Sequence, residues 1–240
     1  MILGANSVTR VTESAAPTGA WCKATVREIV HPSPHAVILR VEVANRINHL
    51  PGQHYVIRLS ADDGYVAQRS YSIASAPADP LLEFYIERLD EGEVSSFLAD
   101  VVEVGDELDL RGPIGGWFVW RADTPALCLG GGSGAVPFAA MVRHARDVGR
   151  VDLLRIALSA RTHDDVPYLE EFRSAGAFVA LTRERAEGRL ASTEIAPLLP
   201  PDGPCFVCGS AAFAEGATDL LMDLQVATPR IKVERFGPSG

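Results

Sequence analysis

A glycine-rich run, Gly130-Gly131-Gly132-Ser133-Gly134, directly follows the apolar segment Leu127-Cys128-Leu129 and precedes a stretch of helical character. Glycines also make ordinary turns, so the run alone is a weak indication. Its place between a strand and a helix strengthens it, because such a turn brings backbone N–H groups close to a phosphate at the helix N-terminus. The run therefore favours an α/β sheet with a pyrophosphate site at its edge.

The second half of the chain alternates between strands and helices. We expect strands at 126–129, 153–158, 178–181, 205–208 and 232–236, and helices at 135–148, 168–174 and 211–224. Strands that alternate with helices form parallel sheets whose binding loops lie at the carboxyl edge. This half is therefore predicted to be a parallel α/β, Rossmann-like domain over residues 122–240.

The first half has a different pattern: short segments in which apolar and polar residues alternate, separated by turns. We expect strands at 24–29, 36–43, 55–59, 69–73, 82–88 and 107–111, and one helix at 94–101. This spacing is typical of an antiparallel β-barrel or sandwich. We assign it to a domain over residues 20–121, and residues 1–19 to a flexible N-terminal arm.

Composition excludes several classes of protein. The net charge of −9 over 240 residues argues against nonspecific binding to nucleic acid. No run of 18 apolar residues occurs, and the N-terminus lacks the features of a signal peptide. The four cysteines are too scattered for a disulfide framework, so a cytoplasmic location without membrane attachment is expected. Cys205 and Cys208 lack further ligands nearby, and no metal site is predicted.

The segment Arg69-Ser70-Tyr71-Ser72 places a cation, two hydroxyls and an aromatic face at the end of an expected strand. That combination suits a flat aromatic cofactor with a phosphate tail, although alone it could be an ordinary strand. A second segment, Gly92-Glu93-Val94-Ser95-Ser96, opens the helix of the first half. Its N–H groups and hydroxyls could hold an anion, or Ser95 or Ser96 could simply cap the helix.

In their order along the chain, these segments resemble the ferredoxin–NADP reductase superfamily. The shared features are Arg-x-Tyr-Ser, a Gly-x-Val-Ser helix start, Gly-Pro-x-Gly at residues 112–115, and Gly-Gly-Ser-Gly-x-x-Pro at residues 131–137. The resemblance covers nearly all of the chain after residue 20. It implies an antiparallel Greek-key β-barrel that binds FAD, followed by an α/β domain that binds NADPH or NADH.

The resemblance also implies roles for residues of the first half. Arg69 would contact the FAD pyrophosphate, Tyr71 would stack on the isoalloxazine, and Ser72 would bond near flavin N5. Main chain at residues 85–87 would line the ring edge, and Val94 and Ser95 would hold the pyrophosphate. The whole implied flavin set is Arg69, Ser70, Tyr71, Ser72, Tyr85, Ile86, Glu87, Glu93, Val94, Ser95 and Ser96.

In the second half, Cys208-Gly209-Ser210 matches the family's Cys-Gly-Pro turn except at its third residue. The family's cysteine faces the nicotinamide. Phe236, in Glu234-Arg235-Phe236, would cover the flavin face opposite Tyr71, while the role of residues 237–240 stays open. The implied catalytic residues are Tyr71, Ser72, Cys208, Glu234 and Phe236. The implied nucleotide set is Gly131, Gly132, Ser133, Gly134, Arg161, Arg183, Arg189, Cys208, Gly209 and Phe236.

Arginines stand where an NAD site often has an acid. Arg161 follows the second strand of the sheet, and Arg183 and Arg189 follow the next one. A guanidinium suits a 2′-phosphate, which predicts a preference for NADPH over NADH. The alternative is that these are solvated surface arginines.

The resemblance thus implies a reductase that passes electrons from NAD(P)H singly to a separate acceptor, such as a ferredoxin or another metalloprotein. The sequence lacks the Cys-x4-Cys-x2-Cys spacing of an iron–sulfur module. Because the first half is acidic, an acidic carrier would need a basic patch, for which Arg46, Arg88 and Arg111 are candidates. The alternatives are a flavin-carrying subunit of a larger complex, or a reductase of free flavin or oxygen.

Overall fold

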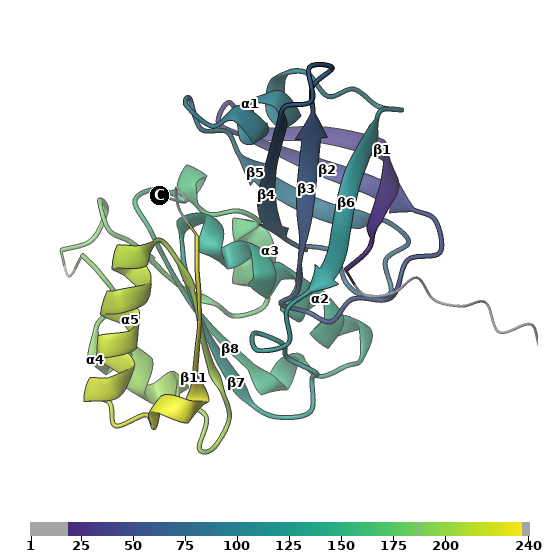
Figure 1. Cartoon of the computed structure of the whole chain (residues 1–240). Coiled ribbons are helices and arrows are strands. Elements are labelled where there is room, and N and C mark those ends of the chain that lie inside the picture. The colour runs from purple at the N-terminus through teal and green to yellow at the C-terminus, as the bar shows by residue number, and fades with distance from the viewer. Residues whose placement is uncertain (1–18, 187, 237–240) are drawn as a thin grey trace, which may run out of the picture.

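The computed structural model describes residues 19–186 and 188–236, which form two sheets packed side by side (Figure 1). The predicted arm, apart from Gly19, and the tail at 237–240 lie outside the described residues. No helix within the described ranges is both long enough and apolar enough to cross a membrane.

The first sheet is antiparallel and follows the order β4-β3-β6-β1-β2-β5. A bridge between Ile73 and Phe84 connects the end of β4 to β5, so the two outer strands approach each other as in a barrel. Helix α1 (Glu93–Asp100) packs against β4 and β5 at this seam. The strands are β1 (Trp21–Ser33), β2 (Ala36–Val43), β3 (His54–Ser60), β4 (Val66–Ser72), β5 (Leu82–Glu87) and β6 (Glu107–Ile114).

Apolar and polar residues alternate along these strands, and the apolar ones form the core of the barrel. In β2, Val37, Leu39 and Val41 are completely buried, while Glu42 on the opposite face is exposed. The buried residues meet Phe84 of β5, whose ring lies 6.1 Å from that of Tyr55 in an edge-on contact. The alternation predicted from the sequence therefore places every second side chain of these strands in the barrel core.

The second sheet is parallel and has the order β11-β10-β7-β8-β9. Its strands are β7 (Ala126–Gly131), β8 (Leu154–Ala160), β9 (Phe178–Leu181), β10 (Cys205–Gly209) and β11 (Ile231–Arg235). Its helices are α2 (Val136–Asp147), α3 (Leu169–Ser174), α4 (Ser192–Ile195) and α5 (Ala211–Asp223). Short 3-10 turns lie at Gly132–Ala135, Val151–Leu153, His163–Asp165, Ala196–Leu198 and Thr228–Arg230.

Both faces of this sheet are covered, so its strands are buried throughout. Cys128 of β7 and Phe206 of β10 face α2 and α3. Leu127 of β7 and Val207 of β10 face α4 and α5. Burial on both faces explains why these strands are continuous apolar runs in the sequence.

Every expected strand and helix is present, although some bounds differ. Strand β1 extends to Ser33 and β4 begins at Val66, both beyond the predicted limits. The short helix α4 was not predicted. The predicted domain boundary at 121–122 lies in the connection between β6 and β7, but Phe118 and Trp120 already pack into the core of the second sheet.

A half-buried arginine connects the two sheets. Arg143 of α2 donates to the carbonyl of Ala74 (2.9 Å) and to the Glu83 carboxylate (2.8 Å), both from the first half of the chain. It also pairs with Glu171 of α3 at 3.0 Å. Its guanidinium lies 4.6 Å from the ring centroid of Tyr168, which in turn contacts the Tyr85 ring. These contacts fix one sheet against the other.

Candidate functional site

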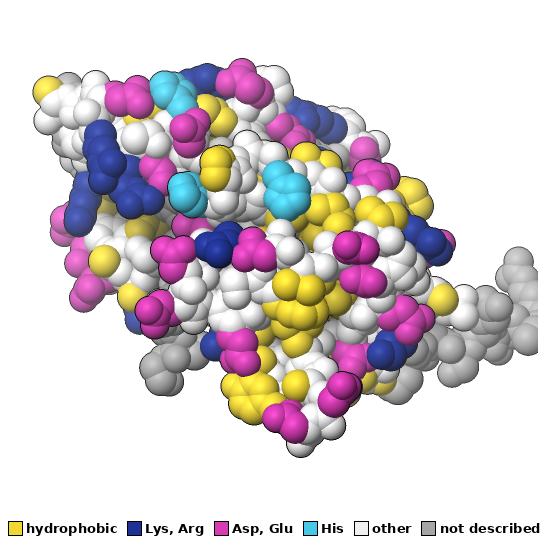
Figure 2. Space-filling model, turned by 90° about the horizontal axis from the view of Figure 1, so that it is seen from above, with side chains coloured by type: hydrophobic (Ala, Val, Ile, Leu, Met, Phe, Trp, Pro, Cys, Tyr) yellow, Lys and Arg dark blue, Asp and Glu magenta, His cyan; other side chains and the backbone are white. Residues whose placement is uncertain are grey.

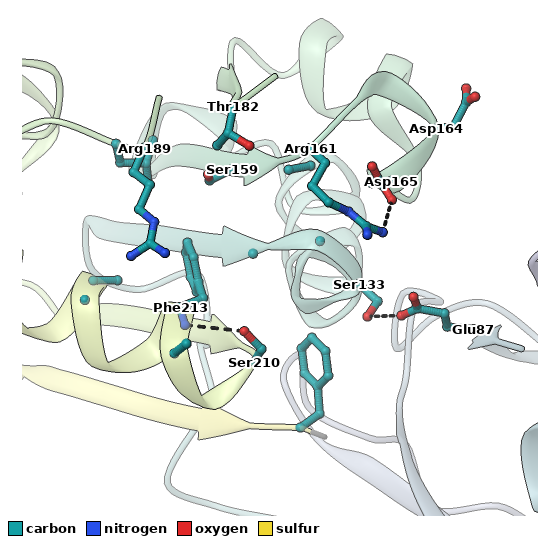
Figure 3. A pocket seen from close by; sticks show the side chains of 18 of the residues that line it. Glu87, Ser133, Ser159, Arg161, Asp164, Asp165, Thr182, Arg189, Ser210 and Phe213 are labelled. Carbon is teal, nitrogen blue, oxygen red and sulfur yellow. Dashed lines mark hydrogen bonds and ion pairs between the residues drawn. The ribbon is translucent and has the colours of Figure 1, made fainter. Parts of the chain in front are cut away.

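A cavity of about 1030 Å³ lies where the carboxyl ends of β7 and β8 face the first half of the chain (Figure 3). Carboxyl ends of parallel strands are the usual binding edge of such sheets. The lining combines Tyr85 and Glu87 of β5 with residues of the second half. Of the residues predicted from the sequence, the cavity is lined by Tyr85, Glu87, Gly131, Gly132, Ser133, Arg161, Arg189 and Phe236.

The glycine run forms the floor of this cavity, and close packing requires its small residues. A Cβ on Gly134 would lie 2.2 Å from the carbonyl oxygen of Cys208, and one on Gly131 would lie 2.4 Å from the Phe213 ring. Gly132 has a φ of +55°, which favours glycine. These glycines let the turn pass directly over β10 before α2 begins.

Ser133 joins the two halves of the chain across the mouth of the cavity. Its hydroxyl donates a hydrogen bond of 2.8 Å to the Glu87 carboxylate at the end of β5 (Figure 3). Both residues were predicted to touch a cofactor. The structure brings them into direct contact.

The end of β11 reaches the same cavity. The Phe236 N–H donates to the carbonyl of Gly209 (3.1 Å), and the Phe236 ring, 40% exposed, lines the cavity. Cys208 is paired with Glu234 in the β10–β11 register, and its thiol is buried beside the cavity without lining it. Burial raises the pKa of the Cys208 thiol, so the thiol stays neutral.

Glu234 has an unusual protonation state for a carboxylic acid. Burial raises its pKa to about 7. Below pH 7 the neutral acid prevails, and above pH 7 a carboxylate stands two residues from Phe236.

We expect the rate of flavin reduction to fall as pH rises through about 7, because ionised Glu234 would repel an anionic nucleotide. Glu234→Gln keeps the side chain neutral and should flatten this dependence. Single-turnover reduction of the protein at several pH values measures it. A pH profile that is the same in both proteins would remove Glu234 from the reaction.

The Arg69 segment lies on a separate face, along the outer strand β4. Arg69 is exposed, and among the described residues its one recorded hydrogen bond is to the neighbouring carbonyl of Gln68 (2.8 Å). Tyr71 lies on the same side of the strand and is partly buried. Ser72 is paired with His54 of β3, and Ser70, exposed, faces the other side.

Helix α1 begins opposite this strand with unpaired backbone donors. Its cap residue Gly92 offers no side-chain hydrogen bond, and a Cβ there would lie 2.3 Å from the Ser95 hydroxyl. Ser95 uses that hydroxyl within the loop, accepting from Leu89 N–H and donating to the Gly92 carbonyl. The Ser96 hydroxyl likewise bonds the Glu93 carbonyl. The first amides of the helix, at Glu93, Val94 and Ser95, are left to bind an anion.

Strand β5, which also contacts α1, could offer a ligand its backbone more than its side chains. Ile86 is fully buried in the barrel, so only its backbone could reach a ligand. Strand β5 is an outer strand of the sheet, and its second edge is paired with residues 73–75 at Glu83 and Phe84, before residues 85–87 begin. This agrees with the expected use of main chain at residues 85–87, which stays a prediction.

The three predicted arginines have different positions. Arg161 lines the cavity and pairs with Asp165 at 2.7 Å, while Arg189 lines it and points toward Phe213 (Figure 3). Arg183 is exposed and is absent from the lining, where its neighbour Thr182 stands instead. The turn after β9 therefore directs Arg189, and not Arg183, into the cavity.

Several lining residues were missed from the sequence. Ser210 accepts from Phe213 N–H (3.3 Å) and caps α5, so both line the cavity at the helix start. Asp165 holds the turn after β8 by accepting from Thr162. The capping pattern of Ser210 and the Thr-x-x-Asp spacing were available signals. Within the described ranges, no three His, Cys, Asp or Glu side chains gather as metal ligands.

Comparison with known proteins finds a family model that is similar to the first half of the chain. Residues 22–119 match the model of the oxidoreductase FAD-binding domain. One relative is the ferredoxin–NAD(P)+ reductase component of the naphthalene 1,2-dioxygenase/salicylate 5-hydroxylase systems of a Ralstonia species. It is 27% identical over 91% of this chain and 70% of its own length. The toluate 1,2-dioxygenase electron transfer component of Pseudomonas putida is 31% identical over 60% of this chain and 43% of its own.

Solved structures share the fold of the whole described chain. The FAD/NAD binding domain of a nitric oxide dioxygenase from Vibrio cholerae matches with a TM-score of 0.78 and 23% identity, covering 90% of this chain and 99% of that one. A ferredoxin NADP+ reductase from Neisseria gonorrhoeae, with bound FAD and NADP, matches with a TM-score of 0.74 and 18% identity, covering 90% and 98%. Both matches show the arrangement of a barrel followed by a parallel sheet.

Proposed function

We propose that the chain belongs to the ferredoxin–NADP reductase superfamily, in its two-domain form, and that it transfers electrons from NAD(P)H through FAD to a separate carrier protein. It is an NAD(P)H-dependent flavoprotein oxidoreductase. The observation that carries the proposal is the cavity in which Tyr85 and Glu87 of the barrel meet Ser133, Arg189 and Phe236 of the α/β half. A nucleotide bound there contacts residues of both halves.

The residues of the barrel fit FAD. Arg69 presents a charged group with no acidic partner recorded among the described residues, and the uncapped start of α1 presents free amides. A pyrophosphate between them would satisfy both. Tyr71 on the same side of β4 offers a ring for stacking. When bound, FAD supplies the ability to accept a hydride and to release electrons singly.

The residues of the α/β half position the nucleotide. The glycine turn lets backbone approach a pyrophosphate, and Ser133 is placed between the two halves by Glu87. Phe236 lines the cavity, and in this proposal its ring would move aside for a nicotinamide to approach the barrel. The protein needs no acid–base group for hydride transfer, so its work is to set distance, orientation and access.

We expect a preference for NADPH over NADH of roughly tenfold to a hundredfold, from a charge-assisted pair worth about 1–3 kcal/mol at a partly exposed site. Because Arg189 points into the cavity and Arg161 is already paired with Asp165, Arg189→Ala should remove most of this preference. The measurement is kcat/KM for both nucleotides. Arg183→Ala is the matched control, since Arg183 lies outside the cavity lining. A loss of preference in the Arg183 variant alone would contradict this placement.

The electron acceptor is proposed to be a ferredoxin or another metalloprotein, as in the oxygenase systems of the relatives. Arg46, Arg88 and Arg111, the candidates for a basic patch, each have partners within the chain. Arg46 donates to the carbonyls of Pro77 and Asp79. Arg88 pairs with Asp90 and Asp100 at 2.9 Å, and Arg111 stacks on Trp21. The face seen in Figure 2 has interspersed acidic and basic side chains.

Reduction of candidate carriers from the host, measured across ionic strength, tests the acceptor. A carrier that is reduced faster than oxygen and free flavin, with a rate that changes with salt, supports the proposal, because such encounters are weak and electrostatic. Free flavin or oxygen reduced as fast as any carrier, without salt dependence, would favour a flavin reductase. A flavin that no nucleotide reduces would favour a subunit that receives electrons from a larger complex.

A further inference from the structure

An acidic side chain of the barrel lies against the glycine turn of the α/β half. Glu87 is the last residue of β5, and its carboxylate accepts a hydrogen bond of 2.8 Å from the Ser133 hydroxyl (Figure 3). Ser133 belongs to the 3-10 turn Gly132–Ala135, which precedes α2. The hydroxyl of the glycine turn is therefore already engaged by an anion that the chain itself supplies.

The negative charge of Glu87 acts inside the cavity. Both Glu87 and Ser133 line it, together with Tyr85. Burial, followed by the charges of Glu87 and Asp165, raises the pKa of the Tyr85 phenol to about 12. Asp165 has a cationic partner, Arg161, at 2.7 Å. For Glu87 no ion pair is recorded within residues 19–186 and 188–236, so the Ser133 hydroxyl is its recorded side-chain partner there.

This contact can open without any change in the backbone. Glu87 is exposed and Ser133 is half-buried. The main chain of Glu87 is paired with Ala36 of β2, and that of Ser133 is held in its 3-10 turn. Rotation of the hydroxyl and a change of rotamer in the carboxylate are enough to separate them. The Ser133 hydroxyl can therefore pass from Glu87 to a ligand while the fold stays the same.

We propose that Glu87 is an internal competitor of the nucleotide: its carboxylate holds the Ser133 hydroxyl in the free protein, and the nucleotide pyrophosphate displaces it. The inference rests on the proposed function, because it takes the glycine turn as the pyrophosphate site. A carboxylate and a phosphate are both acceptors, and the single hydroxyl hydrogen serves one of them at a time. Both are also anions, so the carboxylate repels the pyrophosphate until it turns away. Glu87 thus lowers nucleotide affinity and speeds the release of the oxidised nucleotide.

Equilibrium binding of NADP+ and of NAD+ to the oxidised, FAD-loaded protein tests this competition without turnover. We expect Glu87→Ala to tighten both nucleotides by about threefold to tenfold, because a competing hydrogen bond and a repulsive charge are removed together. Glu87→Gln keeps an acceptor for Ser133 and should give a smaller gain. Asp164→Asn is the matched control, since Asp164 is also an exposed acid of the cavity lining. It should change affinity by less than about twofold.

Ser133→Ala provides a second test, because it removes the hydroxyl for which the two anions compete. In that background Glu87→Ala should tighten the nucleotides by less than about twofold, since the charge repulsion alone remains. Calorimetric titration of the two single variants and the double variant measures this coupling. A gain from Glu87→Ala that is as large without the hydroxyl as with it would contradict the competition.

The remaining outcomes separate this inference from the proposed function. Unchanged or weaker nucleotide binding in Glu87→Ala would overturn the role of Glu87, while nucleotide binding by the unaltered protein stands. Equal gains in Glu87→Ala and Asp164→Asn would overturn it too, because they would show a general effect of charge. Failure of the unaltered protein to bind either nucleotide would overturn the proposed function together with this inference. Flavin content and thermal unfolding of each variant verify that the flavin site and the fold are kept.

Discussion

Replacing Arg143 with alanine is expected to lower the free energy of unfolding by about 2–3 kcal/mol, below the full cost of breaking a fully buried ion pair because the network is partly exposed. The Arg143 side chain is 22% exposed, and its partners Glu83 and Glu171 are 12% and 19% exposed. Without the guanidinium the carbonyl of Ala74 would lose its bond from Arg143, and Glu83 and Glu171 would keep only their partners Arg40 and Arg146. Denaturant unfolding of the whole chain measures the change.

The same variant should also slow flavin reduction, because Arg143 holds Glu83 of the barrel against α2 and α3. A matched control is Arg173→Ala, which breaks an ion pair with Glu170 whose members are 44% and 82% exposed. Exposed pairs of this kind contribute about 0–1 kcal/mol. Equal losses of stability in the two variants would show that Arg143 is no more than a surface arginine.

Replacing Arg69 with alanine should weaken FAD binding by about 1.5–3 kcal/mol, or roughly tenfold to more than a hundredfold, because a charged phosphate contact is lost. Stability of the flavin-free protein should change little, since Arg69 is exposed and bonds only a neighbouring carbonyl among the described residues. Arg27→Ala is a suitable control, as Arg27 is an exposed barrel arginine paired with Glu42. Unchanged FAD affinity in the Arg69 variant would place the pyrophosphate elsewhere.

Local patterns in the sequence predicted most of the fold. The alternation in β2 and the unbroken apolar runs of β7 and β10 report directly whether one face or both faces of a strand are buried. The glycine run is visible in the sequence because close packing against Cys208 and Phe213 leaves room only for glycine at Gly134 and Gly131. Such signals come from residues that are close in the sequence, so they can be recognised from one sequence alone.

The parts that the sequence left undetermined depend on contacts between distant segments. Whether Arg183 or Arg189 enters the cavity depends on the path of the turn after β9, which no periodicity records. Arg143 meets Glu83 across 60 positions, and Tyr65 meets Glu93 across 28. The partners of the candidate patch arginines were undetermined for the same reason, since the acids and carbonyls that engage Arg46 and Arg88 become visible only in the folded chain.

Anaerobic mixing of the purified, FAD-loaded protein with NADPH or NADH, followed by the flavin absorbance in a single turnover, tests the central claim most directly. We expect the absorbance to bleach at a rate that saturates with nucleotide concentration, and to return when a one-electron acceptor is added. A protein that binds no FAD, or that holds FAD which neither nucleotide reduces, would contradict the account.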